Sequence, residues 1–376
     1  TDKFQEKKKN GTKTPRDVVI KLMKSEDQFK REIEKRIGLD PSLVVEVICT
    51  SDDFGIEGGR SKWGCGLEKI HSPLQTWTNY QFGIVMPAAE CNLLTVLLQE
   101  SVDLTLVKKI FSSLAEGLQH LHEHERIHGD FKPGNVVRMV NGQWMLIDMD
   151  GAVSFDAPVG AKALSTAFVG PETTYKSENQ EIGFRVPQKD NTGVEGTEET
   201  KEEARLEGHL AISEVLSPPE LLMAHPTFDV WSFAVVLYRA IAHKPLLEAD
   251  DRDNLRSKHE LNMLATWGPS AICDALTDVG AALTPDGANA IERLVTCNLF
   301  GWCLQPKPQD RPQSLDEILA HSFFAATNGV SAAEVEEEES AGAVGVTEAQ
   351  VLELSKGLKL TTRVHIAAEL GGPLTI

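Results

Sequence analysis

The chain has 376 residues, of which 41% are hydrophobic and 25% are charged, a composition typical of a globular protein with a large core. The formal net charge of -19 excludes a protein-wide basic surface for nucleic acid. No apolar run is long enough for a membrane segment. The six cysteines are scattered without a CxxC pair, which predicts reduced thiols and an intracellular, cytoplasmic location.

The first predicted elements are a strand and a helix that each carry one charged residue of interest. Residues 18–22 form an apolar run that includes Lys21 and predicts a buried strand. A helix is predicted to begin at Ser25, which fits a capping box with Gln28, and to end at Gly38. Glu32 lies beside the apolar face of this helix.

Two more strands and a long helix follow. The apolar runs at residues 43–48 and 82–86 predict strands, and the Gly/Ser/Asp-rich residues 50–76 between them read as an inserted loop. Residues 104–122 have one continuous apolar stripe at helical spacing, which predicts a long amphipathic helix. Residues 1–17 are lysine-rich and resemble a solvated loop.

Residues 127–151 form the most informative stretch of the chain. Asn141-Gly142 predicts a tight hairpin between strands at 136–140 and 144–147, because both turn residues tolerate positive φ. The hairpin would bring two polar loops together. Their side chains are those of Asp130, Lys132, Asn135, Asp148 and Asp150. Carboxylate and amide oxygens suit Mg²⁺ with a bound polyphosphate.

The second half of the chain alternates irregular and helical patterns. Residues 155–210 are irregular and acidic, and the segment Ser-Pro-Pro-Glu ends at Glu220. A helix that is apolar nearly all round is predicted from Asp229 to Ala242, which indicates burial. Residues 325–376 read as an acidic linker with one amphipathic helix at 347–360.

The motifs HGDFKPGN and IDMDG resemble the catalytic and metal-binding loops of the protein kinase family. The resemblance extends over residues 18–324 and implies an α+β, bilobal, protein kinase-like fold. Its parts would be a truncated, β-rich N-lobe (1–86), a hinge (87–92), a mainly helical C-lobe (93–324) and an enlarged activation segment (148–220).

The resemblance implies an ATP- and Mg²⁺-dependent protein kinase that phosphorylates Ser or Thr of protein substrates. Asp130 would orient the acceptor hydroxyl, and Lys132 would neutralise the transferring phosphoryl group. Asn135 and Asp148 would hold Mg²⁺. The ATP-binding residues would be Lys21, held by Glu32, with Met86 at the back of the pocket and Ala88 and Ala89 in the hinge.

The resemblance also implies supporting residues in the large lobe. Arg311 would form an ion pair with Glu220, and Asp229 would brace the catalytic loop. Ser213 would supply the substrate-side hydroxyl near Asp130.

Three departures from the family pattern leave two alternatives open. No Gly-rich phosphate-covering loop precedes Lys21, Gly129 replaces the usual Arg, and Asp150 replaces the usual Gly. The missing loop favours a pseudokinase that only binds partners. The motifs also resemble small-molecule kinases of the aminoglycoside and choline type.

Overall fold

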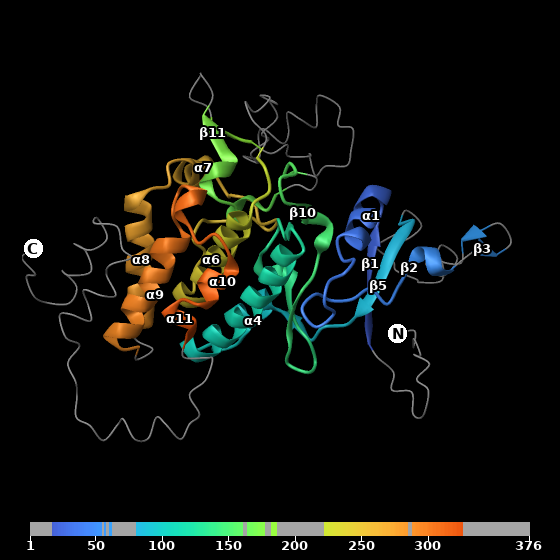
Figure 1. Cartoon of the computed structure of the whole chain (residues 1–376), viewed down its shortest axis with the longest axis horizontal. Coiled ribbons are helices and arrows are strands. Elements are labelled where there is room, and N and C mark those ends of the chain that lie inside the picture. Colours follow the sequence, from blue (N-terminus) through green and yellow to red (C-terminus); the bar gives the residue numbers. More distant parts are fainter. Residues whose placement is uncertain are drawn as a thin grey trace, which may run out of the picture. The chain divides into compact units, whose positions relative to one another are not determined.

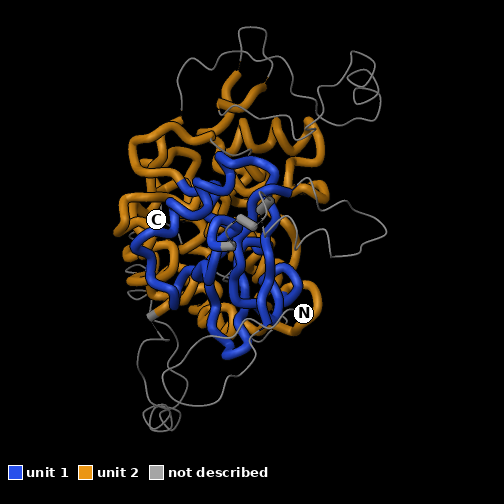
Figure 2. Tube along the Cα trace, turned by 90° about the vertical axis from the view of Figure 1, so that its right-hand side faces the viewer, with its two compact units in different colours: residues 1–96, 133–152 blue, residues 97–132, 153–376 orange. Residues whose placement is uncertain are grey.

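The structure is a computed structural model that describes residues 17–54, 56–57, 60–61, 80–160, 164–176, 182–185, 222–284 and 288–325 (Figure 1). The chain divides into two compact units (Figure 2). Unit 1 comprises residues 1–96 and 133–152, and unit 2 comprises residues 97–132 and 153–376. Within the described ranges, no helix has both the length and the apolar character that crossing a membrane requires.

Unit 1 is built on a three-stranded antiparallel sheet with one helix against it. The strands are β1 (Val18–Met23), β5 (Phe82–Pro87) and β2 (Cys49–Thr50), in the order β1-β5-β2. The central strand β5 is the most apolar, and its Ile84 and Val85 are fully buried. Helix α1 (Glu26–Glu34) places Phe29 with its ring centroid 5.4 Å from that of Phe82. This packing holds α1 against β5, which is paired with the strand that carries Lys21.

A second three-stranded sheet of unit 1 contains the predicted hairpin. Its strands are β6 (Cys91–Asn92), β8 (Val136–Arg138) and β9 (Trp144–Leu146), and of these β8 and β9 are shorter than the sequence predicted. Gly142 has φ 83° and donates its N–H to the carbonyl of Met139, so the predicted turn is present. The 3₁₀ helices η3 (Pro133–Asn135) and η4 (Met149–Gly151) flank the hairpin on either side. The hairpin therefore joins the two loops of unit 1 that carry Asn135 and Asp148.

The predicted strand at residues 43–48 is wrong. Residues 41–43 form a turn, and Val44 makes only an isolated bridge to Leu146. The backbone here is satisfied by the hairpin, because Val45 donates to Leu146 and Leu146 donates to Leu43. In the predicted loop 50–76, the described pieces are η1 (Ser51–Phe54), β3 (Ile56–Glu57) and β4 (Arg60–Ser61). The rest of that loop lies outside the described residues.

Unit 2 is mainly helical and packs around α6 (Pro226–Ala242). The helix begins three residues before the predicted start, because His225 caps it and Pro226 takes its first position. Trp231 and Phe233 of α6 are fully buried, and Phe233 packs against Phe111 of α4. The other helices of the unit are α4 (Leu104–Glu123), α7 (Lys258–Ala265), α8 (Pro269–Leu283), α9 (Ala290–Cys303), α10 (Leu315–Leu319), α11 (Ser322–Ala325) and the 3₁₀ helices η5 (Thr166–Phe168), η6 (Pro171–Thr173) and η7 (Pro308–Asp310).

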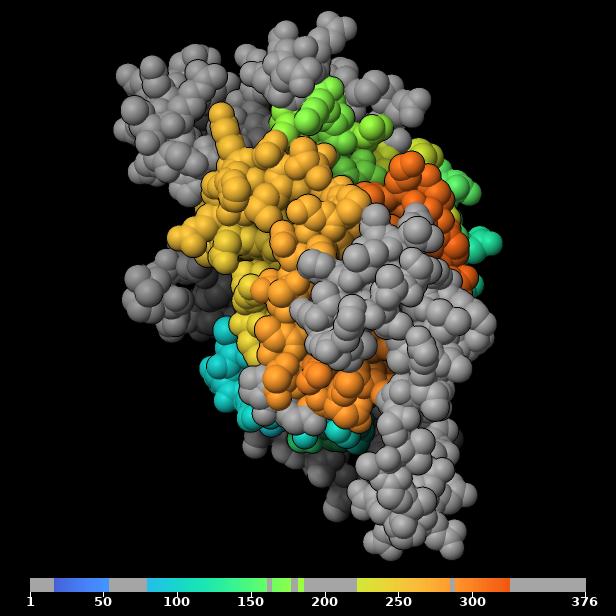
Figure 3. All heavy atoms as spheres, turned by 90° about the vertical axis from the view of Figure 1, so that its left-hand side faces the viewer, coloured from blue at the N-terminus to red at the C-terminus, as the bar shows by residue number. Residues whose placement is uncertain are grey.

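Helices α8 and α9 contribute the orange surface of unit 2 that faces the viewer in Figure 3. Helix α9 starts with a complete capping box, in which Asn289 and Glu292 each accept the other's backbone N–H. Helix α3 (Leu93–Gln99) follows β6 along the chain. These helices, with the small sheets, confirm the predicted α+β class.

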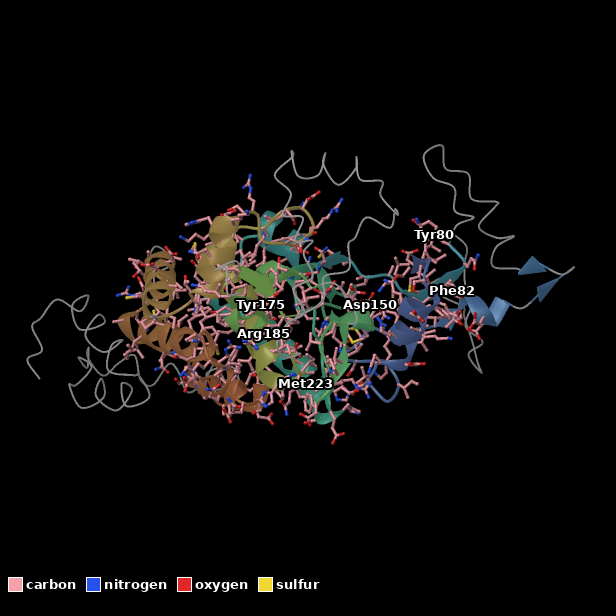
Figure 4. The ribbon with its side chains drawn as sticks, turned by 90° about the horizontal axis from the view of Figure 1, so that it is seen from above. Tyr80, Phe82, Asp150, Tyr175, Arg185 and Met223 are labelled. Atoms are coloured by element: carbon pink, nitrogen blue, oxygen red, sulfur yellow. The ribbon has the colours of Figure 1, made fainter. Side chains whose placement is uncertain are left out.

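Two small antiparallel sheets of two strands each complete unit 2. Strand β7 (Arg126–Ile127) pairs with β10 (Val153–Ser154), and β11 (Thr174–Lys176) pairs with β12 (Ile182–Phe184). Tyr175 lies on β11, and Arg185, directly after β12, donates its backbone N–H to Thr173 (Figure 4). Parts of the predicted irregular segment 155–210 therefore have regular structure. The predicted helix at 347–360 lies outside the described residues.

Candidate active site

A charged cluster in unit 1 consists of Lys21 of β1 with Glu32 and Asp148. Nζ of Lys21 lies 3.0 Å from Oε2 of Glu32, and it also forms a close ion pair with Asp148. The helix that carries Glu32 forms because Ser25 accepts the N–H of Gln28 at 3.4 Å, while Glu26 and Asp27 suit its first turn. The predicted ion pair between Lys21 and Glu32 is therefore present.

The charge of Lys21 is maintained by these carboxylates. Burial lowers the pKa of Lys21, but attraction from Asp148, Glu32 and Asp150 outweighs it, so the net pKa is raised above 10.5. Lys21 is consequently a permanent cation at physiological pH. A fixed positive charge at this position suits a ligand that carries phosphate groups.

Glu32 is held from a second side by Arg36, one helical turn further on. Glu32 is fully buried, and its Oε1 accepts Nη1 of Arg36 at 2.6 Å. Arg36 is itself fixed, because its Nε donates to the carbonyl of Val45 at 3.1 Å and its Nη2 lies 3.9 Å from the sulfur of Met86. Sequence reasoning missed Arg36, although an Arg four residues after a Glu is a recognisable helix pair.

The predicted metal-side residues Asn135 and Asp148 also belong to unit 1. Asp148 has a left-handed backbone, with φ 68°, and its side chain is 19% exposed. Asn135 is buried in η3, and its carbonyl accepts the N–H of Ile147, the residue before Asp148. The hairpin thus returns the chain from Asn135 to the beginning of the second loop.

A group of carboxylates adds two residues to the predicted metal set. Ligand oxygens of Glu32, Asp148 and Asp150 lie within 4.8 Å of one another. Asp150 is only 1% exposed, and its Oδ2 accepts Nε2 of Gln28 at 2.7 Å (Figure 4). Carboxylate oxygens at this spacing fit the ligand preference of Mg²⁺. Asp150, which replaces a Gly of the family pattern, ties η4 to α1 through Gln28.

The predicted hinge residues follow β5. Met86 is 7% exposed and belongs to the apolar cluster of unit 1, and Ala89 packs against this cluster. The N–H of Ala88 donates to the carbonyl of Asp17 at 2.9 Å, so this donor is already used within the chain. Adenine binding at this segment stays a prediction.

The predicted catalytic loop, which lies in unit 2, is anchored by Asp229. This fully buried carboxylate accepts the N–H of His128 at 2.7 Å and the N–H of Gly129 at 3.1 Å. His122 binds the same carboxylate through Nε2 at 2.9 Å. Gly129 has φ 73°, a conformation that a residue without Cβ adopts readily. The predicted bracing of the loop by Asp229 is therefore present, and it fixes the backbone just before Asp130.

Lys132 places its ammonium among three oxygen groups of unit 2. Nζ lies 2.8 Å from Oγ of Ser165, 2.9 Å from Oδ2 of Asp253 and 3.8 Å from Oδ2 of Asp130. Asp130 is buried, and its N–H donates to Nδ1 of His128. A carboxylate and an ammonium thus lie side by side. That pair is suited to orienting a hydroxyl and neutralising a phosphoryl group.

Arg311 and Lys132 have partners in unit 2 that the sequence analysis did not name. The two terminal nitrogens of Arg311 bind the two carboxylate oxygens of Glu172. The hydroxyl of Ser165 contacts Lys132. Ser213 and Glu220 themselves lie outside the described residues. Asp253 was also missed, because no sequence motif marks it.

Comparisons with known proteins agree with these features. The model of the protein kinase domain matches residues 65–186. Over 84% of its length, the chain is 23% identical to a probable serine/threonine-protein kinase of Dictyostelium discoideum and covers 60% of that protein. Over 41% of its length, it is 26% identical to 3-phosphoinositide-dependent protein kinase 1 of Caenorhabditis elegans and covers 24% of it. Over 44%, it is 27% identical to a MAP kinase kinase of Saccharomyces cerevisiae and covers 29% of it. These matches confirm the predicted resemblance and its α+β fold.

Proposed function

Since residues 65–186 match the protein kinase domain, we propose that this chain transfers the γ-phosphoryl group of ATP to serine or threonine hydroxyls of protein substrates. The observation that carries the proposal is the arrangement around Lys21. A buried Glu32 and Asp148 hold this lysine as a cation, which is the arrangement that binding of nucleotide phosphates needs. The cluster also favours an active enzyme over a pseudokinase.

In the proposed reaction, each unit contributes its own set of residues. Lys21 binds the α- and β-phosphates, while Asn135 and Asp148 hold Mg²⁺. When bound, Mg²⁺ neutralises charge on the phosphates. Asp130 orients the acceptor hydroxyl and receives its proton, and Lys132 neutralises the transferred phosphoryl group. Met86, Ala88 and Ala89 take the adenine side of the nucleotide.

The specificity for serine or threonine rests on Lys132 and on the relatives. Lys132 occupies the position that resembles Ser/Thr kinases, and its ammonium is already bound to the hydroxyl of Ser165. One relative is named a probable serine/threonine-protein kinase. We further propose an intracellular, cytoplasmic location, because the cysteines of the described residues are all free thiols.

The test compares Asp130→Asn with Asp274→Asn, an exposed carboxylate on α8. Purified protein is given ATP, Mg²⁺ and a set of serine, threonine and tyrosine peptides, with choline and an aminoglycoside in parallel. We expect the wild type to phosphorylate serine or threonine peptides. The rate of transfer should fall at least about 100-fold in Asp130→Asn and should not change in Asp274→Asn.

Thermal shifts with ATP, with and without Mg²⁺, separate the alternatives. The proposal is supported if ATP raises the melting temperature of both the wild type and Asp130→Asn, while phosphoryl transfer is lost only in the variant. Binding without transfer to any acceptor would instead identify a pseudokinase. Transfer to choline or to the aminoglycoside alone would identify a small-molecule kinase.

A further inference from the structure

The ammonium of Lys132 is bound by a carboxylate that no catalytic motif contains. Oδ2 of Asp253 lies 2.9 Å from Nζ, closer than Oδ2 of Asp130 at 3.8 Å. Both side chains are partly exposed, at 17% for Lys132 and 34% for Asp253. The carboxylate of Asp253 therefore already binds a cation next to the proposed acceptor position.

Hydrogen bonds of the surrounding backbone fix Asp253 at this position. Asp253 has φ 64°, and its carbonyl accepts the N–H of Ala167 at 3.1 Å. Leu255 donates its N–H to Oγ1 of Thr166 at 2.8 Å. These two bonds fasten the loop between α6 and α7 to the segment that carries Ser165. A left-handed aspartate is uncommon, and it persists here because its neighbours Arg252 and Asn254 both donate their N–H groups to Oδ1 of Asp250.

The proposed reaction, on which this inference rests, gives Lys132 two competing anions. Once the ammonium of Lys132 binds the transferring phosphoryl group, the partly exposed carboxylate of Asp253 lies close to the negative charge of that group. Like charges at this distance repel each other. A cationic side chain of the substrate removes the repulsion, since it replaces the ammonium as the partner of Asp253.

We propose that Asp253 makes this site select serine or threonine peptides that carry a basic residue close to the acceptor. The charge of the surrounding loop agrees with this substrate class. Residues 248–256 hold four acidic and two basic side chains. The formal net charge of the whole chain is -19, so its long-range field also attracts basic peptides.

The experiment measures kcat/KM for a set of peptides with one acceptor serine. One arginine is placed in turn at each position near the serine, and the parent peptide is neutral. The enzymes are the wild type, Asp253→Asn and, as matched control, Asp251→Asn, an exposed carboxylate of the same loop. Asparagine tolerates a left-handed backbone, so Asp253→Asn removes the charge and keeps the turn.

We expect at least one arginine peptide to exceed the neutral peptide by about three- to tenfold in the wild type and in Asp251→Asn. In Asp253→Asn this ratio should fall to about one, while transfer to the neutral peptide persists. The inference is overturned if the wild type shows no such preference, or if Asp253→Asn retains it. An equal rise in kcat/KM for all peptides in Asp253→Asn also overturns it, since Asp253 would then only compete with the phosphoryl group for Lys132. Failure of the proposed function looks different, because no peptide would show transfer that Asp130→Asn abolishes.

Discussion

Arg311 and Glu172 lie 139 residues apart in the sequence and form a bidentate ion pair. Nη1 of Arg311 lies 2.8 Å from Oε1 of Glu172, and Nη2 lies 2.7 Å from Oε2. The guanidinium also lies over the ring of Trp231, 4.7 Å from its centroid, and donates Nε to the carbonyl of Gln305. Because Arg311 is fully buried, it depends on these partners to offset the loss of its hydration.

Removal of the Glu172 charge should destabilise the protein strongly. Glu172→Gln leaves a buried guanidinium without its counter-charge, which costs about 3–5 kcal/mol of the free energy of unfolding. Glu220→Gln is the matched control, since the sequence offers Glu220 as an equivalent partner. Urea unfolding of both variants measures the difference. A larger loss of stability in Glu220→Gln than in Glu172→Gln would identify Glu220 as the partner of Arg311.

Glu32 should control the affinity for nucleotide. Glu32→Gln removes one of the carboxylates that hold Lys21 and leaves Arg36 facing a neutral amide. We expect the KM for ATP to rise about tenfold, with little change for Glu34→Gln, because Glu34 is exposed on the same helix. Isothermal titration with ATP provides an independent measurement. Equal affinities for the two variants would contradict this role of Glu32.

Asp148 should bind Mg²⁺ more strongly than Asp150 does. The side chain of Asp148 is partly exposed, whereas Asp150 is buried with one oxygen bound to Gln28. Asp148→Asn should therefore weaken Mg²⁺-dependent ATP binding at least about tenfold, and Asp150→Asn should weaken it less. Mg²⁺ titrations at fixed ATP measure both effects. The assignment is reversed if Asp150→Asn shows the greater loss.

The enzyme should work without phosphorylation of the segment around η5 and η6. Gly129 carries no charge that could bind a phosphate there, and Thr166, Thr173 and Thr174 are buried. The hydroxyls of Thr173 and Thr174 donate to the carbonyls of Gly170 and Pro171, and that of Thr166 accepts from Leu255. We expect phosphatase-treated protein to reach its full initial rate at once. A lag that prior phosphorylation of this segment removes would refute the prediction.

His321 should make the fold sensitive to acid. Burial lowers its pKa below 6.5. Its Nδ1 accepts the N–H of Phe323, and its Nε2 lies 2.8 Å from Oδ1 of Asn298, so one neutral tautomer satisfies both contacts. The unfolded state then binds more protons than the folded state just below pH 6.5, and stability falls as the pH drops through that range.

The measurement is the urea midpoint at about pH 7.5 and about pH 5.5. We expect the loss on acidification to be smaller in His321→Gln than in the wild type. His259→Gln, at an exposed position on α7, serves as the control and should behave like the wild type. An equal loss in His321→Gln and the wild type would exclude His321 as a cause of acid sensitivity.

Local patterns in the sequence predicted those parts of the site that local geometry determines. The hairpin turn contains Gly142, whose φ of 83° is one that glycine adopts without steric cost. The apolar face of α1 places Glu32 toward the sheet, and the contact with Lys21 follows from that placement. The bracing role of Asp229 was implied by the resemblance, and the structure places this buried residue in the first turn of α6.

Contacts that depend on the tertiary path of the chain were not predicted from local patterns. Ser165 and Glu172 are seven residues apart, as are Ser213 and Glu220, and a proline precedes each glutamate. Local sequence cannot distinguish these two segments, because the partners Lys132 and Arg311 are distant along the chain. The residues at 43–48 have strand propensity, yet the structure gives them only an isolated bridge. Asp253 had no local signal at all.

The contact between Arg36 and Met86 links the central strand of unit 1 to a residue just after α1. The sulfur of Met86 lies 3.9 Å from Nη2 of the arginine whose Nη1 holds Glu32. The same guanidinium is also held by the carbonyls of Val45 and Glu32. A side chain other than methionine at position 86 would therefore remove one contact of Arg36 and leave the bonds that orient Glu32 in place.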